Sequence, residues 1–346
     1  MQLFSVHDML WLSGLLGIMV LGSAAILTPI SIGTEPEDDA PEDEELSVSA
    51  EEAEDEEGAP VDMLIAAAEA RTVMTTEEGG VIEEGGTEGE ELYGTDETDH
   101  ISAGGGDDEV AGFGGDDDLL GGDGNDTVHG GDGRDTLAGG AGDDQLFGGA
   151  DDDLVFAGDG ADSLSGDEGN DELQGGRGDN WLSGGAGHDA LHGREGADRL
   201  AGDAGMDTLF GGSGNDLLWG RETGAQESDF LNGGSGADTL VGGAGDVLSG
   251  GTGADSFVLS GAMDGAAGAS VDIMDFDGSE DQIVVFVEDD AFEDDPEVEL
   301  RDADTGETEL WLNGAVIAAF APGAVVALDM ISLLPQSAAA DMGLAG

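Results

Sequence analysis

The chain has 346 residues and a formal net charge of −74 at pH 7, because 81 Asp and Glu residues stand against seven Arg and no Lys. A chain this acidic lacks the basic patches that bind nucleic acids or anionic membrane surfaces, so both classes of partner are excluded. Cysteine is absent, which excludes disulfides, thiolate metal sites and cysteine nucleophiles.

The first predicted element is an uncharged run over residues 9–32. As a helix of ~36 Å it is long enough to cross a bilayer. Three interpretations stay open: a membrane anchor or uncleaved signal, a signal peptide cleaved near Ser23-Ala24-Ala25, or a buried helix. The lack of Lys or Arg before the run disfavours the cleaved signal. We expect residues 1–33 to be a hydrophobic N-terminal segment that attaches the chain to a membrane or serves as a signal.

Residues 34–92 are predicted to form an acidic, disordered linker. Within them, residues 35–58 contain 14 acidic residues and no basic one. Like charges at this density repel one another and keep a chain extended. A short helix over residues 61–70 is the one local structure predicted there, and folded structure is expected to start near Tyr93.

A nine-residue repeat dominates the next region, residues 93–258. At least 17 tandem units run from Ala103 to Val258. The sixth position is Asp in 16 of the 17 units, the exception being Asn180, and the eighth position is apolar in all of them. The units at 220–232 and 242–249 are irregular in length. A pattern this regular predicts one structural unit that is stacked many times.

Each unit follows the order Gly-Gly-x-Gly-x-Asp-x-apolar-x. The glycines suit a tight turn over the first six positions, and the last three can form a very short strand with one inward side chain. Two units then make one turn of a flattened coil. One buried apolar side chain per unit offsets too little of the backbone entropy that glycine-rich loops lose on folding. Such a coil needs a further source of stability.

The column of sixth-position aspartates indicates what that source is. Carboxylates stacked one above another repel, and a divalent cation between successive loops turns this repulsion into attraction. Carboxylate and carbonyl oxygens, without a set of His or Cys, match Ca²⁺ rather than zinc or copper. The free energy of binding multiple Ca²⁺ ions would then become free energy of folding.

Units such as GGDGNDTVH (121–129), GGDGRDTLA (130–138) and GGSGADTLV (233–241) resemble the nonapeptide repeats of the RTX (repeats-in-toxin) family. The resemblance implies an all-β fold, a right-handed parallel β-roll that binds Ca²⁺ in its turns. It also implies that the sixth-position Asp of one unit and of the unit two further on share an ion, together with main-chain carbonyls. Carried over, the metal ligands are Asp108, Asp117, Asp126, Asp135, Asp144, Asp162, Asp171, Asp189, Asp198, Asp207, Asp216, Asp229, Asp238 and Asp255. Sites that involve Phe113, Asp151, Asn180 or the irregular units depart from the family pattern.

Residues 259–346 are predicted to cap the roll. The segments 271–277 and 281–286 are similar to those that close the β-rolls of serralysin-like secreted RTX proteins, and we expect them to form a last coil. Residues 298–301, 307–312 and 315–320 indicate an antiparallel meander, with a turn at Asn313-Gly314 and a last strand within 325–334. The resemblance further implies a C-terminal signal for type I export, within 335–346.

No catalytic pattern stands beside the repeats. His188 and His192 imitate a metalloprotease HExxH motif, but they lie inside one nonapeptide and Asp replaces the Glu. Without Lys the chain has no P-loop lysine and no Schiff base, and it has no GxSxG motif. Trp181 and Trp219 are expected to be surface aromatics of the roll rather than a carbohydrate platform. The protein is therefore predicted not to be an enzyme.

The sequence thus predicts a calcium-binding protein that is extracellular or exposed at the cell surface, with a membrane anchor in the N-terminal segment as an open alternative. Calcium ions are the predicted partner, with the type I export machinery and a cell-surface or polysaccharide partner as further candidates. One alternative is an adhesion, extracellular-matrix or carbohydrate-binding module that uses the calcium-rigidified roll. Another is an enzyme whose site lies in the cap, where Asp, Glu and Arg301 are the available groups.

Overall fold

The computed structural model describes residues 72–76, 79–220, 227–260, 270–289, 292 and 296–341. In this part of the chain no helix is long and apolar enough to cross a membrane. The predicted anchor or signal at 9–32 lies outside the described residues, as do most of the acidic linker and the last residues of the tail. All of the described residues belong to one compact unit, 58–346.

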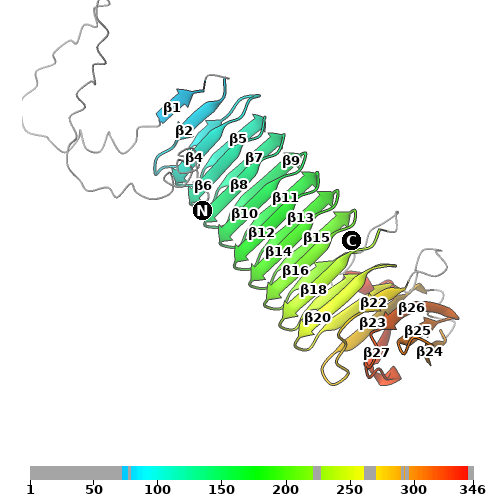
Figure 1. The fold of residues 1–346 in the computed structure, drawn as a ribbon. Coiled ribbons are helices and arrows are strands. Elements are labelled where there is room, and N and C mark those ends of the chain that lie inside the picture. Colours follow the sequence, from blue (N-terminus) through cyan, green and yellow to red (C-terminus); the bar gives the residue numbers. More distant parts are fainter. Residues whose placement is uncertain are drawn as a thin grey trace, which may run out of the picture. The chain divides into compact units, whose positions relative to one another are not determined.

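This unit is built from two sheets that face each other (Figure 1). Sheet A has 15 strands, and in spatial order they are β1 (Thr72–Thr75), β2 (Val81–Glu84), β4 (His100–Gly105), β6 (Asp118–Asp123), β8 (Thr136–Ala141), β10 (Leu154–Asp159), β12 (Glu172–Arg177), β14 (Ala190–Glu195), β16 (Thr208–Ser213), β18 (Phe230–Ser235), β20 (Val247–Thr252), β22 (Val271–Ile273), β26 (Ala315–Phe320), β25 (Thr308–Leu312) and β24 (Val298–Asp302). Sheet B has 12 strands, and from its first strand in the chain they are β3 (Glu91–Tyr93), β5 (Glu109–Gly114), β7 (Thr127–Asp132), β9 (Gln145–Ala150), β11 (Ser163–Glu168), β13 (Trp181–Ala186), β15 (Arg199–Ala204), β17 (Leu217–Trp219), β19 (Thr239–Gly242), β21 (Ser256–Ser260), β23 (Gln282–Val287) and β27 (Ile331–Pro335).

Successive strands of the repeat region alternate between the two sheets, and neighbours within a sheet are parallel. In sheet A Leu137 pairs with Val155, 18 residues later. In sheet B Leu164 pairs with Leu182, again 18 residues later. A shift of 18 residues equals two nonapeptides, so one coil contains two units. The predicted all-β fold, a parallel β-roll with two nonapeptides per coil, is confirmed.

The strands are longer than the sequence indicates. Strand β7, Thr127–Asp132, contains the last three residues of one unit and the first three of the next. The prediction that six residues of each unit form the turn is therefore wrong, and the turn is the Gly-x-Asp segment. Gly131 pairs with Gly149 inside the ladder although its φ is 124°. Without a side chain, such a residue can continue a strand in a conformation that other residues avoid.

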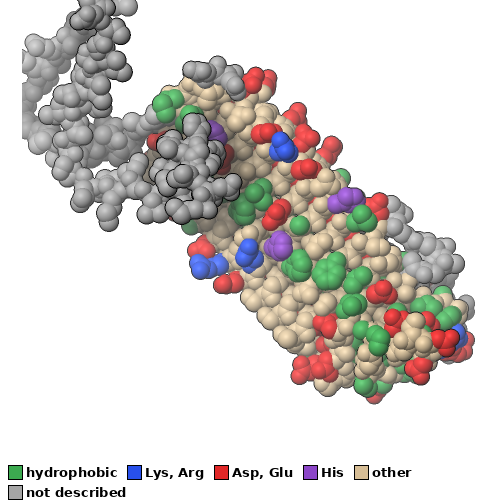
Figure 2. All heavy atoms as spheres, viewed as in Figure 1, with side chains coloured by type: hydrophobic (Ala, Val, Ile, Leu, Met, Phe, Trp, Pro, Cys, Tyr) green, Lys and Arg blue, Asp and Glu red, His purple; other side chains and the backbone are tan. Residues whose placement is uncertain are grey.

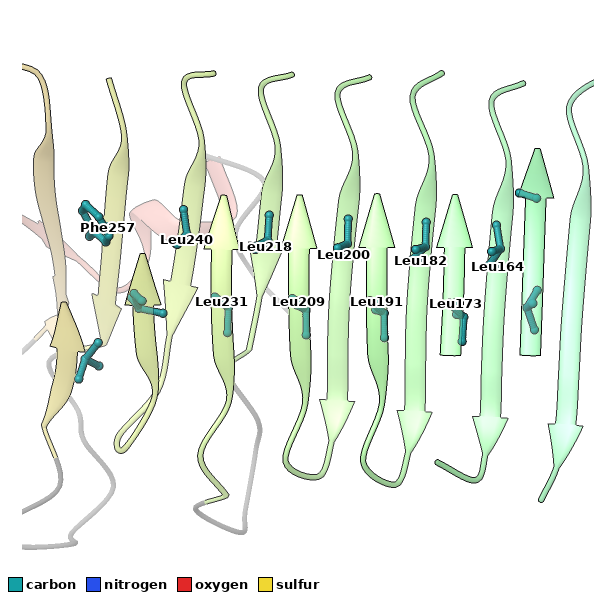
Figure 3. Packing of buried hydrophobic residues seen from close by; sticks show 14 of the residues in the cluster. Leu164, Leu173, Leu182, Leu191, Leu200, Leu209, Leu218, Leu231, Leu240 and Phe257 are labelled. Atoms are coloured by element: carbon teal, nitrogen blue, oxygen red, sulfur yellow. The ribbon is translucent and has the colours of Figure 1, made fainter. Parts of the chain in front are cut away.

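The core is a double row of side chains from the eighth position of each unit. Leu173, Leu191 and Leu209 come from sheet A, and Leu164, Leu182 and Leu200 come from sheet B (Figure 3). All are at most 2% exposed, and they belong to one continuous apolar cluster. Because the first position is glycine, little else fills the space between the sheets. The core is therefore about one side chain thick on each side.

Parallel pairing begins upstream of Ala103. Strand β2 pairs with β4, and β3 pairs with β5, in the same 18-residue register. Strand β2 and the first two residues of β3 lie in the part of the chain that was predicted to be an acidic, disordered linker. Residues 94–102 form a further unit, with Asp99 in the sixth position and Ile101 in the eighth, both buried. The antiparallel strand β1 is the outermost strand of sheet A at this end.

At the other end β22 and β23 add one more coil, as predicted, and β26 and β27 continue the two sheets in parallel. Strands β24, β25 and β26 form the predicted antiparallel meander. Asn313 and Gly314 have φ of 51° and 82°, the positive values that a two-residue hairpin turn requires. The 3₁₀ helix η2 (Leu328–Met330) and the short helix α3 (Ala338–Asp341) flank β27.

Candidate metal centre

The sixth-position acids form two rows, one along each edge of the roll. Each member directly precedes a strand, and all members except Glu90, which is half-buried, are buried. Row A precedes the strands of sheet A and consists of Asp99, Asp117, Asp135, Asp153, Asp171, Asp189, Asp207, Asp229 and Asp246. Row B precedes the strands of sheet B and consists of Glu90, Asp108, Asp126, Asp144, Asp162, Asn180, Asp198, Asp216, Asp238, Asp255 and Asp281.

One oxygen of each carboxylate holds the stack together. The main-chain N–H of Asp108 donates to Oδ1 of Asp126 at 2.9 Å, and that of Asp117 donates to Oδ1 of Asp135 at 2.8 Å. The bond recurs across the irregular units: Asp207 N–H donates to Asp229 at 2.8 Å over a separation of 22 residues. The extra residues therefore do not break the row. The insertion leaves the register of the acids unchanged.

The second oxygen, Oδ2, has no hydrogen-bond partner in most of the interior members. It is buried without a partner in Asp108, Asp117, Asp126, Asp135, Asp144, Asp153, Asp162, Asp171, Asp189, Asp198, Asp216 and Asp238. Their side chains are 1–4% exposed. An unsatisfied buried polar group costs roughly 1–3 kcal/mol, and more when it is charged. A long series of identical orphaned oxygens therefore indicates a missing positive partner.

Main-chain carbonyls lie next to these carboxylates. A Cβ added to Gly112 would lie 2.1 Å from Oδ2 of Asp117 and 2.7 Å from the carbonyl oxygen of Gly130 in the next coil. A Cβ added to Gly160 would lie 1.8 Å from the Gly142 carbonyl oxygen and 2.9 Å from Oδ1 of Asp162. Glycine thus leaves room at points where oxygens from two coils converge. The turns are lined with oxygens from both side chains and main chain.

Burial makes the charged form of the row members unfavourable. It raises the pKa to about 7 in Asp135, Asp144, Asp153 and Asp216, and to about 6 in Asp117, Asp162, Asp171 and Asp238. Neighbouring acids add to the effect, and the hydrogen bond to Oδ1 opposes it. Two carboxylates ~5 Å apart repel by roughly 0.8 kcal/mol in bulk water and about 3 kcal/mol at a protein surface. A cation that neutralises the rows would remove both penalties.

These donors fit Ca²⁺. They are hard oxygens, and calcium accepts six to eight of them in a flexible arrangement, including carbonyls. Among the described residues no group of three or more His, Asp or Glu side chains surrounds one point. Each turn supplies a single buried carboxylate, so carbonyls must complete the coordination. A bound Ca²⁺ would supply two positive charges to a pair of turns, while the chain holds the oxygens in place.

All fourteen aspartates proposed as ligands from the sequence lie in these rows. Asp117, Asp135, Asp171, Asp189, Asp207 and Asp229 are in row A, and Asp108, Asp126, Asp144, Asp162, Asp198, Asp216, Asp238 and Asp255 are in row B. Asp153 is absent from the predicted ligands because Asp151 replaces the usual glycine two positions earlier. Asp151 adopts a φ of 76°, which Asp tolerates better than most residues, and the Asp153 carboxylate is placed like its neighbours. Its position in the column was the signal that could have found it.

The two histidines of the HDALH segment make contacts between neighbouring coils of the roll. Nδ1 of His188 accepts a hydrogen bond from the Met206 N–H at 2.9 Å. His192 stacks on Phe210 with 5.0 Å between ring centroids. The first ring lies in a turn and the second on the outer face of β14, so each has a contact that explains its place.

A stack of acid-bearing turns on a two-sheet parallel coil defines the class of the protein: a calcium-binding β-roll. A family model of the RTX calcium-binding nonapeptide repeat (4 copies) matches residues 93–128, 129–164, 165–200, 192–222 and 223–257. Residues 93–257 are therefore a region of RTX calcium-binding nonapeptide repeats. The search of curated proteins gives no match.

Proposed function

We propose that this protein is a calcium-dependent structural module, not an enzyme, whose roll folds when several Ca²⁺ ions bind between stacked turns. The buried Oδ2 atoms of the two rows carry this proposal. Without a cation, folding would bury two columns of charges that repel each other. With cations between the turns, the same columns hold successive coils together.

The calcium affinity expected for such sites determines the calcium concentration, and so the compartment, in which the protein folds. Extracellular calcium modules bind at ~10⁻⁴–10⁻³ M. In a cytosol poor in free calcium the chain would stay unfolded, and outside the cell it would fold. We therefore propose an extracellular or surface-exposed location, with the type I export that the RTX resemblance implies. Protease treatment of intact cells tests the location: the roll should be digested from outside when calcium is removed.

Circular dichroism of the purified full-length chain tests the calcium-dependent folding. In excess chelator the spectrum should be that of a disordered chain, and added Ca²⁺ should produce a β spectrum. Magnesium at the same concentration serves as the control, because it demands a tighter octahedral site. A β spectrum that persists in excess chelator at neutral pH would contradict the proposal.

A second candidate function, binding of an acidic glycan, is favoured by a groove on the outer face of sheet A. The groove has a volume of about 590 Å³ and is lined by Gly158, Asp159, Gly176, Arg177, Arg194, Glu195, Gly212 and Ser213. Arg177 pairs with Asp159 at 3.1 Å and lies 3.8 Å from Glu195. Within the described residues the Arg194 guanidinium has no ion-pair partner. Because the chain has only seven arginines and no lysine, few other groups could bind an anion as the Arg194 guanidinium could.

Aromatic rings lie on two of the strands that line the groove and on the strand beside them. His192 of β14 stacks on Phe210 of β16, and Phe210 lies 5.9 Å from Phe230 of β18. On the face shown in Figure 2, basic side chains lie near a histidine and a group of hydrophobic side chains. An aromatic surface can contact the apolar side of a sugar ring, while a guanidinium pairs with a carboxylate. Arg194 has a φ of 82°, like other second-position residues such as Phe113 and Asp167, so its backbone conformation follows from the repeat.

Binding of polygalacturonate to the calcium-loaded protein tests this candidate, with neutral dextran as the comparison. Arg194→Gln should weaken binding to polygalacturonate several-fold. Arg199→Gln is the matched control, because Arg199 is an exposed arginine on the other sheet. Equal loss in both variants, or equal binding of both glycans, would argue against a specific site in the groove.

A further inference from the structure

Between their ends, the two acid rows differ at one position, Asn180. Row A carries Asp at every position from Asp99 to Asp246, whereas row B is interrupted by Asn180 between Asp162 and Asp198. Like the acids, Asn180 is buried, with 1% of its surface exposed. Its Oδ1 accepts the main-chain N–H of Asp162 at 3.0 Å, and its own N–H donates to Oδ1 of Asp198 at 2.8 Å. The ladder of hydrogen bonds therefore passes through Asn180 without change.

The difference lies in the second polar atom. Nδ2 of Asn180 occupies the place of Oδ2: a Cβ on Gly175 would lie 2.7 Å from Nδ2, and a Cβ on Gly184 would lie 2.4 Å from Oδ2 of Asp189. In the aspartates this atom is an oxygen that has no hydrogen-bond partner, whereas in Asn180 it is a nitrogen that donates a hydrogen bond. Nδ2 donates to the carbonyl oxygen of Gly178 in the same turn at 3.1 Å.

The contact between Asn180 and Gly178 also indicates which main-chain group lies near Oδ2 of the aspartates. Nδ2 of Asn180 is 3.1 Å from the fourth-position carbonyl, and Oδ2 takes the place of Nδ2 in the acid-bearing turns, so the equivalent carbonyl of those turns should lie near Oδ2. Two oxygens at that distance repel unless a hydrogen or a cation lies between them. At Asn180 the amide hydrogen satisfies the carbonyl. At the aspartates a cation would have to do so.

The ends of the rows follow the same rule. The second carboxylate oxygen of the terminal acids accepts a main-chain N–H from its own turn: Asp99 from Thr95 at 2.5 Å, Glu90 from Gly86 at 2.8 Å, Asp246 from Gly243 at 2.5 Å and Asp281 from Asp277 at 2.7 Å. The chain thus supplies its own donor where a row stops. Inside the rows, no N–H group donates to the orphaned Oδ2 atoms.

We propose that the Asn180 amide takes the place of a calcium ion, so that row B binds calcium as two separate arrays, Asp108 to Asp162 and Asp198 to Asp255, joined by a metal-free turn. Row A binds calcium as one continuous array, to which Asp153 contributes. The terminal acids Glu90, Asp99, Asp246 and Asp281 close the rows with main-chain hydrogen bonds. This inference rests on the proposed calcium-dependent folding of the roll.

Native mass spectrometry of the full-length chain in calcium tests the inference with Asn180→Asp. This variant should bind at least one more Ca²⁺ per chain than the wild type. In chelator it should be less folded, because it adds a buried charge. Asn215→Asp is the matched control: it makes the same chemical change one position before a row member, at an exposed residue whose Oδ1 caps the N–H of Ala237. It should leave the ion count unchanged.

Three outcomes are distinguishable. If the wild type binds no calcium, the proposed function itself fails. If the wild type binds calcium but Asn180→Asp binds the same number of ions, the metal-free turn is refuted. If Asn215→Asp gains as many ions as Asn180→Asp, the gain reflects added surface charge, and the inference is again refuted. An extra ion in Asn180→Asp alone supports it.

Discussion

The main-chain N–H of Asp126 donates to Oδ1 of Asp144 at 2.9 Å, although 18 residues separate them. Oδ2 of the same Asp144 carboxylate is buried without a partner. One oxygen therefore sets the spacing of the coils, while the other is left for a ligand. The same side chain links the stacking of the roll to its capacity to bind metal.

Removing one charge inside a row should cost calcium without destroying the fold. Asp144→Asn keeps an oxygen for the Asp126 N–H, and its new amide can donate to the carbonyl of Gly142, as Asn180 does with Gly178. The variant should bind fewer Ca²⁺ ions by equilibrium dialysis and keep its β spectrum in saturating calcium. Asp143→Asn, at an exposed position, is the control and should bind as many ions as the wild type.

The fourth-position glycines should not tolerate a side chain. Gly124 has a φ of 141°, and a Cβ there would lie 1.8 Å from the carbonyl oxygen of Gly106. Gly124→Ala should destabilise the calcium-loaded protein by about 2–4 kcal/mol, the sum of backbone strain and overpacking. Gly306→Ala is the matched control: its φ is 89° but nothing lies within 4 Å of the added carbon. It should cost about 1 kcal/mol in the same urea titration. Equal costs would contradict the close stacking of the turns.

Because each unit contributes one side chain to the core, each buried leucine should contribute strongly to the stability of the roll. Leu191 is fully buried, and Leu191→Ala should destabilise the roll by about 2–5 kcal/mol in calcium. Leu120 is 41% exposed on the outer face, and Leu120→Ala should change stability by less than about 1 kcal/mol. In a repeat protein the damage should stay near the mutated coil. Hydrogen exchange should show faster exchange in β12–β16 than at the distant coils, and uniform loss of protection would oppose this view.

Acid should partly replace calcium. Burial raises the pKa of Asp135 and Asp144 to about 7, whereas Asp in an unfolded chain titrates near ~3.9. The folded state thus binds protons more tightly than the unfolded state. The calcium-free roll should therefore gain stability as the pH falls from about 8 to about 5, with little further change below about 4. Calcium affinity should fall over the same range, because protons compete for the carboxylates.

Circular dichroism in chelator and calcium titration at each pH measure these two trends. The first trend should appear as a growing β signal on acidification. The opposite sign, a loss of structure between about pH 8 and 5 without calcium, would mean that the carboxylates are not held in the buried rows described above.

The nine-residue period was enough to predict the two-unit coil, the buried eighth-position core and the row of sixth-position acids. Each depends on a local rule: glycine permits the turn, one apolar residue faces inward, and identical units stack in identical ways. Leu191 and Asp189 could be placed in this way from the sequence alone. The meander around Asn313-Gly314 was equally predictable, because its turn chemistry is local.

Other features depend on contacts between coils, and the sequence does not contain them in a readable form. The first coils, with Asp99 and Ile101, were missed because their residues match the repeat poorly, although pairing with β5 and β6 holds them in place. The place of Asp153 in row A was missed because its turn breaks the local pattern while its neighbours preserve the row.

The sequence by itself determined the class of fold and the chemistry of the ligands, because both follow from residues nine positions apart that obey the same local rule. Only the tertiary structure decided which oxygens are free. Whether a carboxylate oxygen at Asp144 or an amide at Asn180 finds a partner depends on the carbonyls and N–H groups of turns that are brought together 18 residues apart.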